Sequence, residues 1–198
     1  MKKGLKIYVF RHGQTTYNRD GIFTGFKDSK LTKLGRRQAG VIAKKLKNKK
    51  FQAAFYTRLS RSKDTLKPVL KFHPECVLLF KDDRMIERGY GSLEGKTHKS
   101  VIEKYGKARF DKWHRGFNIL PGLPGKRKGE SYVNVGKRVR NFIFDLKKFM
   151  KKNNVSVAIS AHGNSIRLFR KIMERASVKE ATSWFIPYDK VFVYDVRV

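Results

Sequence analysis

The chain has a single cysteine and no long hydrophobic run. With only Cys76 among 198 residues, an internal disulfide is excluded, and we expect an unreactive thiol in a reducing cytoplasm. No apolar segment approaches the length of a membrane-spanning helix. The lysines after Met1 resemble the start of a secretory signal, but the apolar stretch that follows is short and ends in Arg11. We therefore expect a first β-strand there.

Acidic residues are also scarce. The sequence holds 47 lysines and arginines against 16 aspartates and glutamates, a formal net charge of +31. Most of these cations cannot be paired, so we expect the protein to attract anions and to bind nucleic acid non-specifically at low salt. The basic residues are spread along the whole chain, however, and a lysine-rich composition without such a role explains them equally well. The 40% hydrophobic and 13% aromatic content favours a globular protein.

Hydrophobic patterning predicts one α/β domain over residues 1–198. Apolar strand-like runs alternate with amphipathic helical patterns, so we expect a three-layer α/β/α architecture with a mostly parallel central sheet. The strands are expected at residues 5–10, 53–57, 76–80, 155–160 and 191–198, the last at a sheet edge.

Helical patterns lie between these strands. The first helix is expected to run from a cap at Thr32 to about Lys47, and Ser60 is expected to cap the second. The buried face of the first helix should carry Leu34, Val41, Ile42 and Leu46. The clearest helix begins at Ser131, and two more follow His162, the last opened by a capping box from Ser177 to Glu180.

The middle of the chain has a different pattern. Two short helices are expected at residues 97–105 and 107–115, followed by a loop rich in glycine and proline. We predict that residues 94–130 form a small lid over the edge of the sheet.

Two histidine–glycine pairs follow two of the predicted strands. Arg11-His12-Gly13 comes directly after the first strand, and His162-Gly163 follows the fourth. If these strands are parallel, both imidazoles emerge at the carboxyl edge of one sheet, where ligands bind in open α/β sheets. Arg61 follows the second strand and Glu87 the third, so we expect both to join the histidines.

This combination of side chains suits phosphoryl transfer. Arginine binds phosphate oxygens through two N–H groups and stays charged at any working pH. A neutral imidazole nitrogen can attack phosphorus and form a covalent intermediate. A nearby carboxyl group can protonate a leaving alkoxide and later accept a proton. The set therefore predicts a phosphohistidine enzyme in which positioning and charge stabilisation supply most of the catalysis.

Each histidine also has a structural interpretation. A lone histidine near a strand end is more often a hydrogen-bonded structural residue than a catalytic one. Metal binding by His12 and His162 is an alternative, but the sequence lacks the close spacing of His, Asp and Glu that is typical of a zinc site. His73, beside Pro74, is expected to be an exposed loop residue.

Several ordered motifs resemble those of the histidine phosphatase superfamily, and within it the 2,3-bisphosphoglycerate-dependent phosphoglycerate mutases. In chain order they are Arg11 to Asn18, similar to RHGxxxxN; Phe23 to Phe26 with Asp28, Leu31 and Gly35; Leu59-Ser60-Arg61 with Thr65; Glu87 to Gly91, similar to ERxYG; Lys104-Tyr105-Gly106; Trp113 to Phe117; Gly129-Glu130-Ser131; and Ala161 to Arg167, similar to AHGNSLR. The resemblance covers nearly the whole chain. It implies a phosphoglycerate mutase-like fold.

The resemblance also implies roles for individual residues. His12 would carry the phosphoryl group, Glu87 would be the general acid and base, and Arg11, Arg61 and His162 would bind the transferred group. The residues expected to line the substrate pocket are Asn18, Thr24, Gly25, Arg88, Tyr90, His98, His114, Arg115, Gly163 and Asn164. The implied reaction interconverts 3-phosphoglycerate and 2-phosphoglycerate, a step of glycolysis and gluconeogenesis. It is primed by 2,3-bisphosphoglycerate and requires no metal, and members of this family often form homodimers.

Some positions depart from the mutase pattern. His98 stands where the mutases have a lysine, with Lys99 adjacent, and His114-Arg115 replaces a pair of arginines. The loop from Pro121 to Gly129 is short, and the chain ends soon after its last predicted strand, so we expect a less closed pocket. Water would then hydrolyse the phosphohistidine.

Two alternatives to a mutase therefore remain. The first is a phosphatase that hydrolyses small phosphomonoesters through the same phosphohistidine. The second is a basic nucleic-acid-binding module with an idle catalytic set, although the sequence shows no aromatic RNA-binding motif and no outstanding basic recognition helix.

Overall fold

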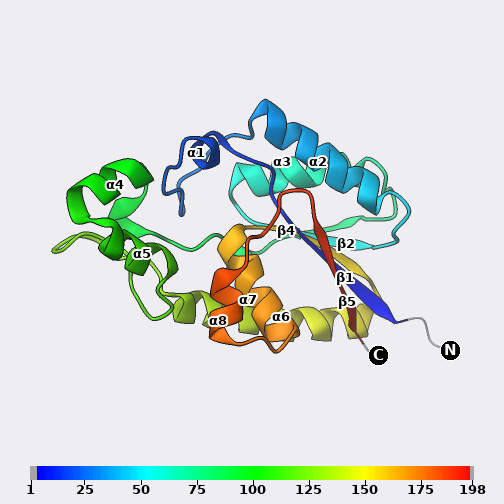
Figure 1. Ribbon diagram of the computed structural model, residues 1–198. Coiled ribbons are helices and arrows are strands. Elements are labelled where there is room, and N and C mark those ends of the chain that lie inside the picture. The colour runs from blue at the N-terminus through cyan, green and yellow to red at the C-terminus, as the bar shows by residue number, and fades with distance from the viewer. Residues whose placement is uncertain (1–3, 197–198) are drawn as a thin grey trace.

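The computed structural model describes residues 4–196, in which a five-stranded sheet is covered by helices on both faces (Figure 1). The strands are β1 (Leu5–Arg11), β2 (Ala53–Tyr56), β3 (Leu78–Lys81), β4 (Val157–Ala161) and β5 (Val191–Val196). Their order in the sheet is β3-β2-β4-β1-β5, and all neighbours are parallel except β5, which pairs antiparallel with β1. The mostly parallel sheet and the last strand at an edge are confirmed. Residues 197 and 198 of that expected strand lie outside the described residues.

The larger helices form the two outer layers. The helices are α1 (Thr16–Arg19), α2 (Lys33–Leu46), α3 (Ser60–Leu70), α4 (His98–Tyr105), α5 (Lys107–Arg115), α6 (Tyr132–Asn153), α7 (Gly163–Met173) and α8 (Val178–Ser183). Alternate residues of β1 point to opposite faces of the sheet. Tyr8 and Phe10 pack against α2 and α3, whereas Ile7 and Val9 pack against α6 and α7. This alternation gives the sheet two separate apolar cores.

The buried face of α2 differs from the expected one. Ile42 and Leu46 are buried, but Leu34 and Val41 are exposed. The remaining buried positions of the helix are the small residues Gly35, Ala39 and Ala43. They allow α2 to approach the neighbouring backbone closely, so small residues and not the large apolar ones mark its inner face. The cap at Thr32 is confirmed, since its side chain accepts a hydrogen bond from the Gly35 amide at 2.9 Å.

The other differences concern ends of elements and one histidine. β3 begins at Leu78, so Cys76 and Val77 precede it. Leu59 and not Ser60 occupies the capping position of α3. His73 is buried and not exposed, because its ring packs on Phe51 with centroids 4.1 Å apart.

The segment that we expect to act as a lid packs in a separate apolar cluster beside the sheet. α4 and α5 lie beyond the sheet in Figure 1, and the loop that follows them leads back to α6. The lid core consists of Phe23, Tyr90, Leu93, Val101, Phe110 and Trp113. Phe23 comes from the loop after α1, so that loop and the lid enclose one space at the carboxyl edge of the strands. Among residues 4–196, none of the helices has both the length and the apolar character needed to cross a membrane.

Candidate active site

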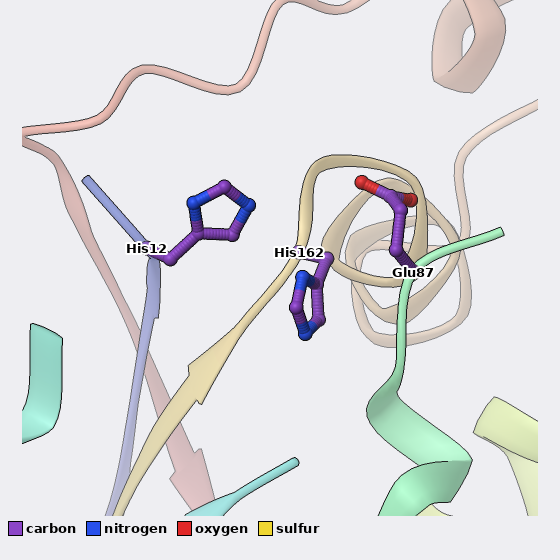
Figure 2. Close-up of side chains that lie close together, drawn as sticks. All are labelled: His12, Glu87 and His162. Atoms are coloured by element: carbon purple, nitrogen blue, oxygen red, sulfur yellow. The ribbon is translucent and has the colours of Figure 1, made fainter. Parts of the chain in front are cut away.

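The register of the sheet brings the two histidines together. Arg11 on β1 is opposite Ala161 on β4, so His12 and His162 leave neighbouring parallel strands at the same level. Their ring centroids are 5.0 Å apart. Figure 2 shows both rings with Glu87, which comes from the segment after β3. One side-chain nitrogen or oxygen from each of the three residues lies within 4.8 Å of the others.

His12 is held in the form that a nucleophile needs. Its Nδ1 lies 2.8 Å from the carbonyl oxygen of Gly13. A carbonyl only accepts, so Nδ1 carries the proton and Nε2 keeps its lone pair. Burial, together with the charges of Arg61 and Arg11, lowers the pKa of His12 well below its usual value. The ring is therefore neutral at physiological pH.

Three unpartnered nitrogens belong to the residues around His12. Within the described part of the chain, the Nε atoms of Arg11 and Arg61 and Nδ1 of His162 are buried and make no hydrogen bond. The other nitrogen of His162, Nε2, lies 2.8 Å from the Thr57 hydroxyl, which donates to it when Nδ1 is protonated. Buried N–H groups without an acceptor are costly. Three such groups on residues near His12 indicate a site for an anion with several oxygens.

The Arg61 side chain is fixed by backbone carbonyls. Its Nη atoms donate to Lys27 O at 2.9 Å and to Gly25 O at 3.0 Å. Burial lowers the pKa of Arg61 to about 10, which leaves it charged at neutral pH. The guanidinium is thus pre-organised, with Nε free for a ligand.

Glu87 is positioned through one of its two oxygens. Oε1 accepts hydrogen bonds from the amide of Arg88 at 2.8 Å and from that of Asn164 at 3.1 Å. Oε2 takes no part in these bonds. It is the oxygen that can carry a proton to or from a bound group.

A hollow of about 220 Å³ opens at this edge of the sheet, with Arg11 and Glu87 in its wall. Nine of the ten residues expected to bind substrate line it: Asn18, Thr24, Gly25, Tyr90, His98, His114, Arg115, Gly163 and Asn164. His12, Arg61 and His162 do not line it. They are buried beside the lining residues Arg11, Gly25 and Gly163.

Arg88 is the exception among the ten. Its side chain is fully buried and donates to three backbone carbonyls: Glu130 O at 2.7 Å, His114 O at 3.1 Å and Ile119 O at 3.0 Å. The guanidinium thereby joins the lid to the start of α6, and Arg88 is not among the residues that line the hollow. A contact between Arg88 and the substrate stays a prediction.

His98 and His114 form a pair in the lid wall. Their ring centroids are 5.3 Å apart, and the rings of Phe23 and Phe110 pack against both. Burial and the neighbouring charge of Arg115 lower the pKa of His114 to about 3, and burial lowers that of His98. Both imidazoles are therefore neutral at physiological pH in the free protein.

The sequence did not point to eight further residues of the wall. They are Tyr17, Gly21, Ile22, Phe23, Arg167, Phe185, Ile186 and Tyr188. Arg167 ends the motif that contains His162, so its position was a usable signal. Phe185, Ile186 and Tyr188 lie between α8 and β5 and match no motif, so only the folded chain places them at the site.

The spacing of His12, Glu87 and His162 would also allow a metal ion. Burial lowers the pKa of both histidines, and the positive charges of Arg61 and Arg11 lower it further. A field that disfavours a proton on these rings also disfavours a metal cation and favours an anion. A metal-independent site stays our prediction.

Comparison with known proteins agrees with this geometry. The family model of the histidine phosphatase superfamily (branch 1) matches residues 7–197. The chain belongs to this superfamily. A 2,3-bisphosphoglycerate-dependent phosphoglycerate mutase of Bartonella henselae is 33% identical over 180 residues, which cover 89% of this chain and 85% of the relative.

Solved structures of superfamily members share the fold. A putative alpha-ribazole-5'-P phosphatase from Escherichia coli superposes with a TM-score of 0.81 at 18% identity, covering 98% of this chain and 91% of that one. A phosphoglycerate mutase from Bacillus anthracis gives 0.75 at 21% identity, covering 96% and 88%. At such identities the likeness concerns the fold alone. It includes both a phosphatase and a mutase, so the fold does not choose between them.

Proposed function

We propose that this superfamily member transfers phosphoryl groups through a phosphohistidine at Nε2 of His12. The observation that carries the proposal is that Arg11, Arg61 and His162, which lie near His12, each have a buried nitrogen without a partner, while Nδ1 of His12 bonds to a carbonyl. These donors would bind the oxygens of the PO₃ unit and stabilise the charge that develops on them.

The steps assigned to the chain are as follows. Nε2 of His12 attacks phosphorus, the bond from phosphorus to the ester oxygen breaks, and the proton on Oε2 of Glu87 passes to the leaving alkoxide. Glu87, now ionised, accepts a proton from the next hydroxyl group. That oxygen attacks the phosphohistidine, and His12 returns to its neutral form.

For the overall reaction we propose a 2,3-bisphosphoglycerate-dependent phosphoglycerate mutase. The name of the Bartonella henselae relative supports it, as does the presence of Arg115 and Arg167 in the wall of the hollow. Two arginines at a distance from the His12 site suit a substrate with a second anionic group. The primer would be 2,3-bisphosphoglycerate, and we extend the proposal to a cytoplasmic location.

A second candidate is a phosphatase that uses water as the acceptor. It is favoured by His98 and His114, because neutral imidazoles hold a bisphosphate less firmly than lysine or arginine would. If the dephosphorylated product leaves while the phosphoryl group is still on His12, water attacks the phosphorus, the bond to Nε2 breaks and inorganic phosphate is released.

One assay separates these candidates. The protein is incubated with 3-phosphoglycerate, with and without 2,3-bisphosphoglycerate, and both 2-phosphoglycerate and free phosphate are measured. A mutase gives primer-dependent 2-phosphoglycerate, whereas a phosphatase gives phosphate at a rate the primer does not raise. Acid-labile phosphate on the wild-type protein but not on His12→Ala supports the shared first step. Turnover that survives His12→Ala contradicts both.

A further inference from the structure

Residues 184–189, which we call the strap, join α8 to β5 beside the active site. Phe185, Ile186 and Tyr188 of the strap line the hollow. No backbone–backbone hydrogen bond holds the strap to the rest of residues 4–196. Other contacts must therefore keep it in place.

Ile186 is buried in the larger apolar core, and cationic side chains donate hydrogen bonds to three carbonyls of the strap. Nη2 of Arg167 donates to Trp184 O at 2.6 Å, and Nζ of Lys45 donates to Asp189 O at 2.7 Å. Between them, Nη1 of Arg11 donates to Ile186 O at 2.9 Å. Arg11 is the central anchor, and it is also one of the residues that carry an unpartnered donor beside His12.

Aromatic and backbone surfaces fix the plane of the Arg11 guanidinium. Its Cζ lies 4.0 Å from the centre of the Tyr188 ring. Gly163 is close as well, since a Cβ there would lie 3.4 Å from Cζ of Arg11. The ring of Tyr188 also lies 6.5 Å from that of His12, measured between centroids. The hydrogen bond from Nη1 to the strap and the contact with the Tyr188 ring together determine where Nε of Arg11 points.

We propose that Tyr188 is a positioning residue that orients Arg11 so that its Nε can bind the phosphoryl group on His12. The inference rests on the proposed phosphohistidine reaction. It also explains why the strap is bound to Arg11, because this arginine would contact both the phosphoryl group on His12 and the strap. An arginine side chain is flexible, and a cation–π contact in a partly desolvated site is strong enough to select one orientation.

The proposal predicts a defect in kcat. Misplacing a charge-stabilising group by about 1 Å can cost about 100-fold in rate. We expect Tyr188→Ala to lower kcat about 10- to 100-fold with a small phosphomonoester such as p-nitrophenyl phosphate, with a smaller change in KM. Tyr188→Phe keeps the ring and should stay within about twofold of the wild type, since the stacking and not the hydroxyl is required.

The matched control is Phe144→Ala on α6. Phe144 is an exposed ring with Nζ of Lys148 4.2 Å from its centre, so this variant also removes a cation–π contact, but outside the hollow. Its kcat should equal that of the wild type. Unfolding midpoints of all variants show whether a loss of activity reflects a loss of folded protein.

A double-mutant cycle tests whether Tyr188 acts through Arg11. In an Arg11→Lys background the planar group is gone, so adding Tyr188→Ala should change kcat by less than about twofold. Equal losses from Tyr188→Ala in both backgrounds would overturn the proposal, and so would a wild-type kcat in the single variant. Loss of activity in Tyr188→Phe would overturn it as well. His12→Ala tests the proposed function separately. If this variant kept full activity, the phosphohistidine mechanism would be contradicted whatever the Tyr188 variants showed.

Discussion

Gly13 and Gly35 bring the loop after β1 into direct backbone contact with the first turn of α2. A Cβ on Gly13 would lie 2.2 Å from Gly35 O, and a Cβ on Gly35 would lie 2.0 Å from Gln14 O. The amide of Gly13 also donates to the Thr65 hydroxyl at 3.0 Å. The carbonyl that fixes the tautomer of His12 thus belongs to a residue held between two helices. No side chain fits at either position in this structure.

The first prediction concerns this contact. Gly35→Ala should lower the free energy of unfolding by about 3 kcal/mol or more, because the clash is with rigid backbone. Gly40→Ala lies in the same helix with no atom within 4 Å of the added Cβ, and it should be neutral or stabilising by up to about 1 kcal/mol. Urea unfolding of the two variants checks the difference. Equal stabilities would show that the backbones can separate without cost.

Much of the site could be predicted because it depends on sheet topology. Alternating and continuous apolar runs identify β1 and β4, and parallel pairing then fixes His12 beside His162. The local sequence pattern could not predict which residue each side chain contacts in the folded protein. Leu34 and Val41 are apolar but meet solvent, since α2 packs through its small residues. The position of His73 beside a proline similarly gave no sign of the Phe51 ring.

Arg88 shows the same limit within a motif. Its motif implies a place in the wall of the substrate pocket, yet its donors bind carbonyls that become available only when the lid folds back on α6. The strap is a second case. Nothing in residues 184–189 has a local signature, and their role depends on Arg11, which is more than 170 residues away in the chain.

The second prediction follows from the position of Arg88. Arg88→Met should lower stability by about 3 kcal/mol, because three carbonyls lose the charged donor that the buried guanidinium supplies. Hydrogen exchange should increase in residues 94–130. The control is Arg115→Met, an exposed residue of the hollow, which should raise KM and leave the unfolding midpoint unchanged. A variant of Arg88 with full stability and a raised KM would mean that this side chain serves the substrate instead.

The third prediction concerns stability and pH. Burial lowers the pKa of His12, His98, His114 and His162, so the unfolded chain binds protons near pH 6.5 that the folded protein does not. Stability should therefore fall as the pH drops below about 6.5. With the pKa of His114 at about 3, His114→Asn should reduce this slope by about 1.4 kcal/mol per pH unit between about pH 6 and 4.

Urea unfolding at several pH values measures that slope. Lys112→Asn, on the exposed side of the same helix, is the control and should retain the wild-type slope. If His114→Asn also retained it, the imidazole of His114 would have to titrate equally in the folded and unfolded states.

The last prediction concerns the net charge of +31 and its relation to catalysis. Residues 33–71, which include α2 and α3, contain thirteen lysines and arginines and one acidic residue, Asp64. We expect single-stranded RNA to bind without sequence preference at 25 mM salt and to be largely released at about 200 mM, because affinity gained by counterion release falls steeply with salt. Fluorescence anisotropy with labelled oligonucleotides of different sequence measures this.

His12→Ala should bind RNA as the wild type does, whereas replacing exposed Arg37, Lys44 and Lys63 with glutamate should weaken binding and leave phosphomonoester turnover intact. Sequence-selective binding that persists at 200 mM would instead assign the charge to nucleic-acid recognition, since a diffuse positive field cannot distinguish one base sequence from another.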